Sequence, residues 1–393
     1  MDPRTNPYAP GAGSPPPELA GRDDTIERAA IALDRIRMGR PARSLILVGL
    51  RGVGKTVLLN HIRRDAEARG IIGVSIETPE DRSLPSLLVP ALRIGLLQLS
   101  RIEALRARLD FAGRVLASAA KAFKIKFQDV EFNFDAISEM GIADSGDFER
   151  DLSDLFVAVG SAARERQTAL VLAIDELQYV PETQLSALIA ALHRASQEQL
   201  PVTMIAAGLP QLMGLAGRAK SYAERLFEFA QIGALGQDDA TLALCKPAER
   251  EGVEFSPGAI VEILRRTHGY PYFLQEWGKH AWNIAKVSPI ETVDAEKATE
   301  SALADLDAGF FRVRFDRLTP AEKRYMRAMA ELGSGPHRSG DIAEVLGKKV
   351  TNVAPVRSSL VAKGMLYSPA HGDNAFTVPL FDGFMKRTIP LAK

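Results

Sequence analysis

Apolar residues along the chain follow two patterns that alternate. Short, mostly apolar runs occur at 45–48, 71–77, 169–174 and 201–208, and the segments between them repeat apolar residues every three or four positions. The first pattern is typical of buried parallel strands, and the second is typical of amphipathic helices. Strands alternating with helices over residues 45–232 therefore predict an α/β fold with a parallel sheet and helices on both faces.

Residues 84–146 interrupt this alternation. Helical periodicity runs from about 84 to 123, and residues 124–134 then alternate apolar with polar side chains on either side of Gln128–Asp129. This alternation predicts a hairpin with one apolar face. Two interpretations of the insertion stay open, an edge hairpin that packs on its own helix and an arm that binds a partner.

The strand pattern stops at Gln237. Three amphipathic segments at 238–250, 257–267 and 272–285 predict a small helical domain within residues 236–310.

Residues 311–393 change character again. Thr319-Pro-Ala-Glu322 is a capping box with proline at the first helical position, and its helix is expected to end near Leu332. Two more helices and two strands are expected at 339–347, 351–363, 365–368 and 375–378. Three helices followed by a β-hairpin predict a winged helix-turn-helix.

The N-terminus and the overall composition set the limits of the structured part. Residues 1–17 are rich in proline and are expected to be disordered, so the α/β domain is assigned to residues 18–235. Of the 393 residues, 46% are hydrophobic and 25% are charged, and the net charge is zero, so only a local patch could attract nucleic acid. Cys245 is the only cysteine, which excludes an intramolecular disulfide and a zinc site built from several thiolates. We expect no signal segment, no membrane partner and a cytoplasmic location.

A glycine-rich turn follows the apolar run at 45–48. Residues 49–56 read G-L-R-G-V-G-K-T, which fits the pattern G-x-x-x-x-G-K-[ST], and an amphipathic helix continues to Ile62. Glycines let backbone N–H groups turn toward an anion, and the helix N-terminus adds positive potential, so a phosphate site is expected. The candidate nucleotide-binding residues are Gly49, Leu50, Arg51, Gly52, Val53, Gly54, Lys55, Thr56 and Val57.

Four side chains carry the expected chemistry. Lys55 supplies positive charge to the β and γ phosphates, and the Thr56 hydroxyl can ligate Mg²⁺. The run at 169–174 ends in Asp175 and Glu176, and the C-terminal end of a buried parallel strand lies at the ligand crevice. Asp175 is expected to hold Mg²⁺ and Glu176 to polarise the attacking water. ATP and Mg²⁺ are thus the expected cofactors, and ATP hydrolysis is the expected reaction.

The P-loop, the Asp-Glu strand end, the helical lid and the winged helix together resemble AAA+/STAND ATPases of the origin-recognition and archaeal-ATPase type. The likeness covers about residues 19–390. The chain is also similar to bacterial proteins called only "ATP-binding protein" or "AAA family ATPase". The resemblance implies a P-loop NTPase sheet of the AAA+ type, a lid and a switch-like function.

The resemblance also implies roles for three further residues. Arg22, in a Gly-Arg pair, matches a position that touches the base side of the nucleotide, and Pro271, in Gly-Tyr-Pro, matches a proline that packs near adenine. Arg225 stands where such families place a catalytic arginine finger. For Arg22 and Arg225 an ordinary surface arginine is the alternative.

Two departures from the family pattern concern its sensor residues. The strand at 201–208 ends in Ala-Ala-Gly, where a polar sensor is usual. Near Gly269 the closest cations are Arg266 and Lys279, and neither matches a sensor arginine clearly. Both departures favour a slow switch over a motor.

The C-terminal region holds an excess of positive charge. Residues 319–393 contain eleven Lys or Arg and six Asp or Glu. The candidate DNA contacts at the expected recognition helix are Lys348, Lys349, Thr351, Asn352 and Arg357. Duplex DNA is therefore an expected partner. In the alternative, the winged helix packs back on the nucleotide region, as in STAND proteins, and relays its state to protein partners or further copies of the chain.

Overall fold

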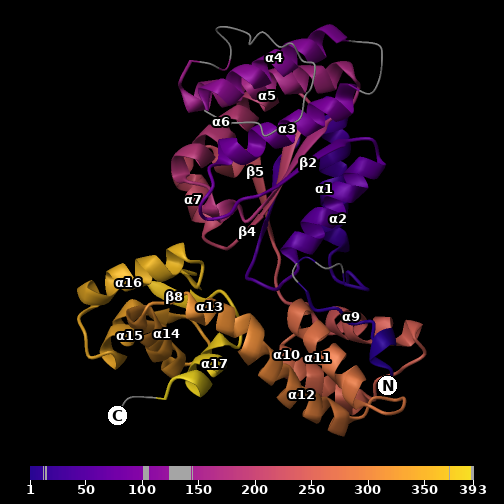
Figure 1. The fold of residues 1–393 in the computed structure, drawn as a ribbon, viewed down its shortest axis with the longest axis vertical. Coiled ribbons are helices and arrows are strands. Elements are labelled where there is room, and N and C mark those ends of the chain that lie inside the picture. The colour runs from indigo at the N-terminus through magenta and orange to yellow at the C-terminus, as the bar shows by residue number, and fades with distance from the viewer. Residues whose placement is uncertain are drawn as a thin grey trace.

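The computed structural model describes residues 1–11, 13, 16–100, 106–123, 143, 145–370 and 372–390. The predicted hairpin at 124–134 lies outside these residues. Figure 1 shows three regions, with the α/β region at the top and two helical regions side by side below it.

A five-stranded sheet forms the centre of the α/β region. Its strands are β1 (Ser44–Val48), β2 (Ile72–Glu77), β3 (Leu170–Asp175), β4 (Val202–Gly208) and β5 (Phe227–Gln231). They lie in the order β2-β3-β4-β1-β5, and every neighbouring pair is parallel. The predicted α/β fold with a parallel sheet is confirmed.

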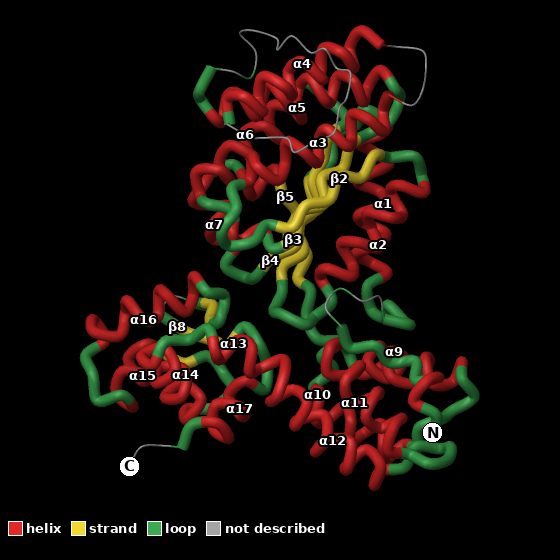
Figure 2. Tube along the Cα trace, in the orientation of Figure 1, coloured by secondary structure: helices red, strands yellow, loops and turns green. Residues whose placement is uncertain are grey.

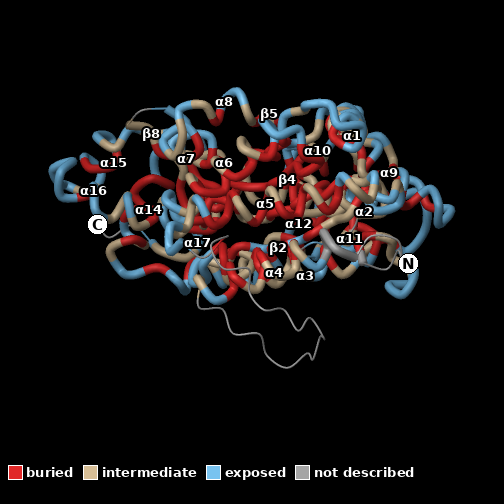
Figure 3. Tube along the Cα trace, turned by 90° about the horizontal axis from the view of Figure 1, so that it is seen from above, coloured by how far each residue is buried: buried red, intermediate tan, exposed pale blue. Residues whose placement is uncertain are grey.

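Helices cover both faces of this sheet (Figure 2). One face is covered by α1 (Asp23–Arg37) and α2 (Lys55–Ala68). The other face is covered by five helices, α3 (Leu84–Ser100), α4 (Arg106–Ala122), α5 (Phe148–Glu165), α6 (Glu182–Gln197) and α7 (Leu212–Ala219). Alternate residues of β1 enter the two cores, with Leu45 and Leu47 on the α1–α2 side and Ile46 and Val48 on the other. Burial on both faces explains why the strand reads as continuously apolar. Figure 3 shows buried segments in red in the middle of the molecule, around β4.

The lid contains the three expected helices and one more. α9 (Gln237–Arg250), α10 (Pro257–Thr267) and α11 (Pro271–Ile284) match the prediction, and α12 (Thr292–Leu306) follows them. The buried face of α12 is built mainly of alanines such as Ala295, Ala298 and Ala302, which give a weak apolar signal in the sequence. A π-helical turn, η3 (Asp307–Phe311), then leads directly into α13 (Arg312–Asp316).

The C-terminal region has its elements in the predicted order. α14 (Pro320–Leu332) begins with the expected capping box between Thr319 and Glu322, and α15 (Ser339–Val345) and α16 (Val350–Ala362) follow. The antiparallel strands β6 (His337–Arg338), β7 (Leu366–Tyr367) and β8 (Asp373–Phe376) form a small sheet in the order β6-β8-β7. β6 and the final helix α17 (Phe381–Thr388) were not predicted.

The N-terminal segment differs from the prediction of disorder. Residues 1–11 lie along the lid, where Trp282 Nε1 donates to the Asp2 carbonyl at 2.9 Å. The Tyr8 side chain is buried and its hydroxyl donates to the Leu244 carbonyl. The ring packs over Gly278, where a Cβ atom would come within 2.6 Å of it. Burial of the Tyr8 side chain against the lid offsets the conformational entropy that this segment loses on ordering. The proline-rich composition alone gave no sign of this contact. Among the described helices, none is long and apolar enough to cross a membrane.

Candidate nucleotide-binding site

A cavity of about 590 Å³ lies at the C-terminal edge of the sheet. Its walls come from the P-loop, the end of β3, the lid, the η3–α13 turn and the N-terminal segment. Ligands of open α/β sheets bind at this edge, beyond the carboxyl ends of the strands. The cavity lining brings together residues that are far apart in the sequence, from Ala9 to Arg314.

The P-loop supplies the part of this cavity that can hold phosphate. Gly52 and Gly54 adopt φ of +83° and +89°, in the left-handed region that favours glycine. α2 begins directly afterwards, at Lys55, so its first free N–H groups point toward the cavity end of the helix. Residues 51–57 line the cavity, whereas Gly49 and Leu50 face the cleft toward the C-terminal region.

Lys55 is a buried cation. Its side chain is 9% exposed, and Nζ donates to the Leu50 carbonyl at 2.8 Å. Burial lowers the pKa of Lys55 to about 8, while the carboxylates of Glu176 and Asp175 oppose this shift. Burying a charge is costly unless an anion accompanies it, so this position suits a phosphate group.

Thr56 and Asp175 meet at the floor of the cavity. The Thr56 hydroxyl donates to Asp175 Oδ2 at 2.6 Å, and the Glu176 N–H donates to Asp175 Oδ1 at 2.8 Å. Burial raises the pKa of Asp175, and the hydrogen bond from Thr56 opposes that effect. A hydroxyl and a carboxylate side by side are hard oxygen ligands of the kind that Mg²⁺ takes beside phosphates, so these residues fit the ion.

Glu176 is held in place by its neighbours. It has a left-handed backbone, with φ of +54°, and its Oε1 accepts from Arg51 Nη1 at 3.2 Å. Its Oε2 accepts from Gln178 Nε2. Arg51 Nη2 in turn donates to the Tyr179 hydroxyl at 2.6 Å. Both carboxylate oxygens of Glu176 therefore have partners in this conformation.

Gln178 lies beside the end of β4, where the sequence of the strand itself offers no polar side chain. Its Oε1 accepts from the Leu209 N–H at 3.0 Å, and its side chain is buried. A Cβ atom on Gly208 would come within 2.8 Å of this oxygen, so glycine makes room for the amide. The sequence argument missed Gln178 because the amide comes from the 3-10 turn η2 (Leu177–Tyr179) after β3.

Arg22 and Pro271 both line the cavity. Arg22 Nη2 donates to the Gly233 carbonyl at 2.6 Å, and burial lowers the pKa of Arg22 while Asp239 opposes the shift. Next to Pro271, Tyr272 stacks on Phe310 with ring centroids 4.6 Å apart.

Arg314 is a cavity residue that the sequence argument did not identify. It lies on α13, and its guanidinium carbon sits 4.0 Å from the centre of the Phe310 ring. Burial lowers the pKa of Arg314 to about 10, and the cation of Arg51 adds to this effect while Glu176 opposes it. The signal in the sequence is the run of aromatic residues and arginines at 310–314, which follows a helix that was not predicted. Arg266 instead pairs with Glu262, and Lys279 lies near Glu276.

Arg225 does not reach this cavity. It lies exposed on the short helix α8 (Ala223–Leu226), directly before β5. β5 begins at Phe227, which is the register partner of Ser44 at the start of β1. Arg225 is therefore at the edge of the sheet opposite to the P-loop, so any action on a nucleotide would have to be on another copy of the chain.

The P-loop is also in direct contact with the C-terminal region. The Arg51 N–H donates to the Thr377 carbonyl at 3.1 Å. Gly364 lies against the same residue, because a Cβ atom there would come within 3.0 Å of the Tyr179 hydroxyl and 3.1 Å of Arg51 Nη2. Arg51 therefore touches Glu176 on one side and the C-terminal region on the other.

The candidate DNA contacts fall into two groups. Lys348, Lys349, Thr351 and Asn352 are exposed around the start of α16. Arg357 is separate from them, because its Nε donates to Asn374 Oδ1 at 2.5 Å and its Nη2 to Ser368 Oγ at 2.9 Å. It also lines the cleft between the C-terminal and α/β regions. Arg357 thus ties α16 to the β-hairpin in this conformation.

Two family models match parts of the chain. Residues 18–205 match the model described as "AAA ATPase domain", and residues 308–385 match one described as a domain of unknown function. With the sheet order and the P-loop geometry, these findings define the fold: the α/β region has the fold of P-loop NTPases, and residues 18–205 are similar to AAA ATPase domains. Nucleotide binding is the property that this class shares.

Individual proteins are also similar to this chain. A curated relative, an uncharacterized HTH-type transcriptional regulator of Methanocaldococcus jannaschii, is 26% identical over 236 residues, which are 58% of this chain and 56% of the relative. The chain thus spans about half the length of that relative. Among solved structures, the Walker-type ATPase of Pyrococcus abyssi is similar with a TM-score of 0.57 at 16% identity over 94% of this chain and 96% of that one. The Orc1 protein of Aeropyrum pernix in complex with DNA gives 0.46 at 15% identity, over 95% and 94%.

Proposed function

We propose that this protein is an ATP-dependent switch that hydrolyses ATP slowly and couples its nucleotide state to the C-terminal region. In this proposal the backbone of residues 51–57 and the Lys55 ammonium hold the phosphates, and Arg22 and Pro271 contact the base side. Thr56 and Asp175 hold Mg²⁺, which when bound neutralises charge on the phosphates. The buried Lys55 and the adjacent oxygens of Thr56 and Asp175 support this arrangement.

Glu176 is the residue proposed to orient the attacking water and accept its proton. A general base needs a carboxylate oxygen within hydrogen-bond reach of that water. Arg51 and Gln178 each donate one hydrogen bond to a Glu176 oxygen, and each oxygen keeps a second lone pair that can accept the water. The attacking water must share the carboxylate with these two donors, which supports slow turnover. Arg314 is proposed to place positive charge near the phosphates from the lid side, the position for which no sensor arginine was found in the sequence.

The coupling between nucleotide and C-terminal region rests on one observation, the double role of Arg51. Its guanidinium holds Glu176 at 3.2 Å, and its N–H donates to the Thr377 carbonyl at 3.1 Å. A change at the γ-phosphate that moves Arg51 would disturb both contacts at once. We therefore interpret the conformation seen here as the closed state, in which the C-terminal region is docked on the P-loop.

Duplex DNA is the proposed ligand of the C-terminal region, with residues 311–393 acting as a winged helix. The exposed Lys348 and Lys349 lie at the N-terminal end of α16, where the helix adds positive potential toward phosphate. Thr351 and Asn352 stand on the first turn of the same helix, at positions that can reach base edges. The relative's description as an HTH-type regulator supports the proposal.

The test is fluorescence anisotropy with labelled duplex DNA, with ADP or a non-hydrolysable ATP analogue present and at increasing salt. We expect ATP-dependent binding that weakens with salt, because contacts to phosphate release counterions. Reversal of both charges in Lys348→Glu/Lys349→Glu should abolish it. The matched control is Lys246→Glu/Lys297→Glu on the lid, far from α16. Binding that is absent in every nucleotide state, or insensitive to salt, would overturn the DNA proposal.

A second candidate function is a switch whose partner is a protein. Val345 and Val350, on either side of the two lysines, are 41% and 47% exposed, which gives the same turn an apolar surface. In this case the ATP form assembles with further copies, and Arg225 acts in trans as an arginine finger. Light scattering with each nucleotide measures the assembly. Arg225→Ala should then lower hydrolysis and leave nucleotide affinity unchanged.

A further inference from the structure

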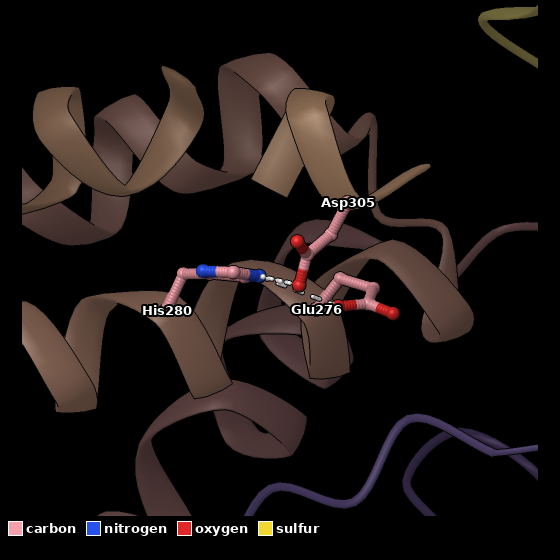
Figure 4. A group of neighbouring side chains, drawn as sticks. All are labelled: Glu276, His280 and Asp305. Carbon is pink, nitrogen blue, oxygen red and sulfur yellow. Dashed lines mark ion pairs between the residues drawn. The ribbon is translucent and has the colours of Figure 1, made fainter. Parts of the chain in front are cut away.

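Three titratable side chains meet in the lid, on the side of α11 that faces α12 (Figure 4). Glu276 and His280 are one helical turn apart on α11, and Asp305 is near the end of α12. Their ligand atoms all lie within 4.8 Å of one another. None of the three lines the nucleotide cavity.

Two of these groups carry a buried side-chain atom that makes no hydrogen bond to any described residue, although charged neighbours lie within ion-pair distance. Glu276 is 6% exposed, and its Oε2 makes no hydrogen bond in the part of the chain that the structure describes. The same holds for His280 Nε2, which is directed toward the two carboxylates. Burial raises the pKa of Glu276, while Lys279, Tyr272 and His280 oppose the shift. Buried polar atoms of this kind are costly unless something binds them.

The spacing of the three side chains suits a small divalent cation. His280 Nε2 lies 3.1 Å from Asp305 Oδ2 and 3.7 Å from Glu276 Oε2. Zn²⁺ with bonds of about 2.0–2.1 Å in a tetrahedron separates neighbouring ligand atoms by about 3.3 Å. One imidazole and two carboxylates are ligands that Zn²⁺ accepts, and three protein ligands leave the fourth position to water.

Lys279 is the competitor for this position. Its Nζ lies 3.7 Å from Glu276 Oε2 and 3.5 Å from Asp305 Oδ2. Its side chain is 34% exposed, so it can turn into solvent when a cation with shorter contacts arrives. An ammonium at these distances satisfies the two carboxylates only partly.

We propose that Glu276, His280 and Asp305 form a binding site for a divalent transition metal of the Zn²⁺ class. The ion would fasten α11 to α12 behind the nucleotide cavity. Tyr272 connects the two sites, because its hydroxyl donates to Glu276 Oε1 at 3.2 Å while its ring stacks on Phe310 at the cavity wall. The proposal goes beyond the switch function and does not depend on it.

Zn²⁺ titration of the metal-stripped full chain by calorimetry tests the site, with Mg²⁺ as the comparison ion. We expect one Zn²⁺ per chain, and a visible spectrum of four-coordinate Co²⁺ when Co²⁺ replaces it. Because changes in outer-shell partners alone cost 10–100-fold, loss of a ligand in His280→Ala or Asp305→Asn should weaken Zn²⁺ binding by at least about 100-fold. His61→Ala, at an exposed histidine on α2, is the control and should bind normally.

The Lys279→Ala variant separates a metal site from an ion-pair network. Removal of the competing ammonium should tighten Zn²⁺ binding several-fold, whereas equal or weaker binding contradicts the placement of the metal between the carboxylates. Circular dichroism confirms that each variant is folded. No Zn²⁺ uptake by the wild-type chain, or undiminished uptake by folded His280→Ala, overturns the proposal.

Discussion

The lid and the C-terminal region approach the P-loop in different ways. The lid and the segment η3–α13 that follows it close over the cavity with side chains, through Pro271, Tyr272 and Arg314, which line the space for a nucleotide. Beyond α13, the C-terminal region contacts the P-loop from the outside, through the Thr377 carbonyl and the closely packed Gly364. The lid contacts can therefore respond to which nucleotide is present, whereas the C-terminal contacts can respond only to a movement of the protein.

Because of this difference, variants in the two regions should change different measured quantities. Changes on the cavity side should alter nucleotide affinity or the chemical step. Changes on the outer side should alter the equilibrium between docked and released C-terminal regions and leave nucleotide affinity nearly constant. The following variants test that division, beginning with the largest expected effect.

Glu176→Gln should lower ATP hydrolysis by about 10²–10⁴-fold, the usual contribution of a general base. ATP affinity should stay near that of the wild type, because Glu176 is not among the groups that hold the phosphates and the amide oxygen can still accept from Arg51 or from Gln178. Single-turnover hydrolysis and nucleotide titration measure the two quantities. Hydrolysis at the wild-type rate would show that another group orients the water.

Lys55→Ala should weaken ATP affinity by about 10–100-fold, since a hydrogen bond to a charged group contributes about 1.5–3 kcal/mol. The expected loss falls on affinity, in contrast to Glu176→Gln. Titration with a fluorescent ATP analogue measures it, with Lys121→Ala on α4 as the control. Equal affinity of the two variants would contradict the cavity-side assignment of Lys55.

The affinity for ATP should also fall as the pH rises through about 8. The pKa of Lys55 is lowered to about 8, so its positive charge is present below that pH and is lost above it. Titrations between pH 7 and 9 measure the effect. Lys55→Arg stays charged over this range and should flatten the pH dependence. A profile that is the same in both proteins would exclude Lys55 as its source.

Arg314→Ala should weaken ATP affinity by about tenfold through loss of one charged contact from the lid side. Arg312→Ala is the matched control, because Arg312 is exposed, lies two residues away on the same helix and does not line the cavity. If both variants bind ATP normally, Arg314 belongs to the packing of the lid and not to the nucleotide site.

Gly364→Ala should release the C-terminal region and raise basal hydrolysis by about fivefold, the factor that corresponds to about 1 kcal/mol. The added Cβ meets Tyr179 and Arg51, while Gly347→Ala is a close control with the same φ of +62° and no neighbour within 4 Å. Small-angle scattering should show an expanded Gly364→Ala protein. Equal behaviour of the two variants would mean that backbone strain, and not the contact, is responsible.

The sequence predicted the parts of the site that are built locally. Gly52, Lys55 and Asp175 follow from a pattern within one strand-turn-helix unit or at one strand end, and the fold of the α/β region follows from the same strands. Two other residues near the cavity, Arg314 and Gln178, could not be predicted in this way. Arg314 follows a helix whose buried face is mostly alanine, and Gln178 reaches β4 from a neighbouring turn, so neither belongs to a short motif.

The N-terminal segment and Arg357 are two cases in which the structure differs from the sequence-based prediction. Composition predicted disorder for a segment in which a single aromatic residue, Tyr8, finds a partner surface on the lid. Charge and helix position predicted a DNA contact at Arg357, whose guanidinium instead bonds to Asn374 and Ser368. Both cases depend on contacts between distant segments, which periodicity does not encode.

The π-helical turn η3 is a point at which the connection between the lid and the C-terminal region can bend. Because α12, η3 and α13 follow one another without a loop, the lid and the C-terminal region are joined by one continuous helix. A π-turn has a widened hydrogen-bond ladder, so bending is easiest there, one residue before α13 begins. If the helix bends at this turn, a small rotation of the lid would displace α16 by an amount that grows with its distance from the turn. The turn itself borders the nucleotide cavity through Gly309 and Phe310.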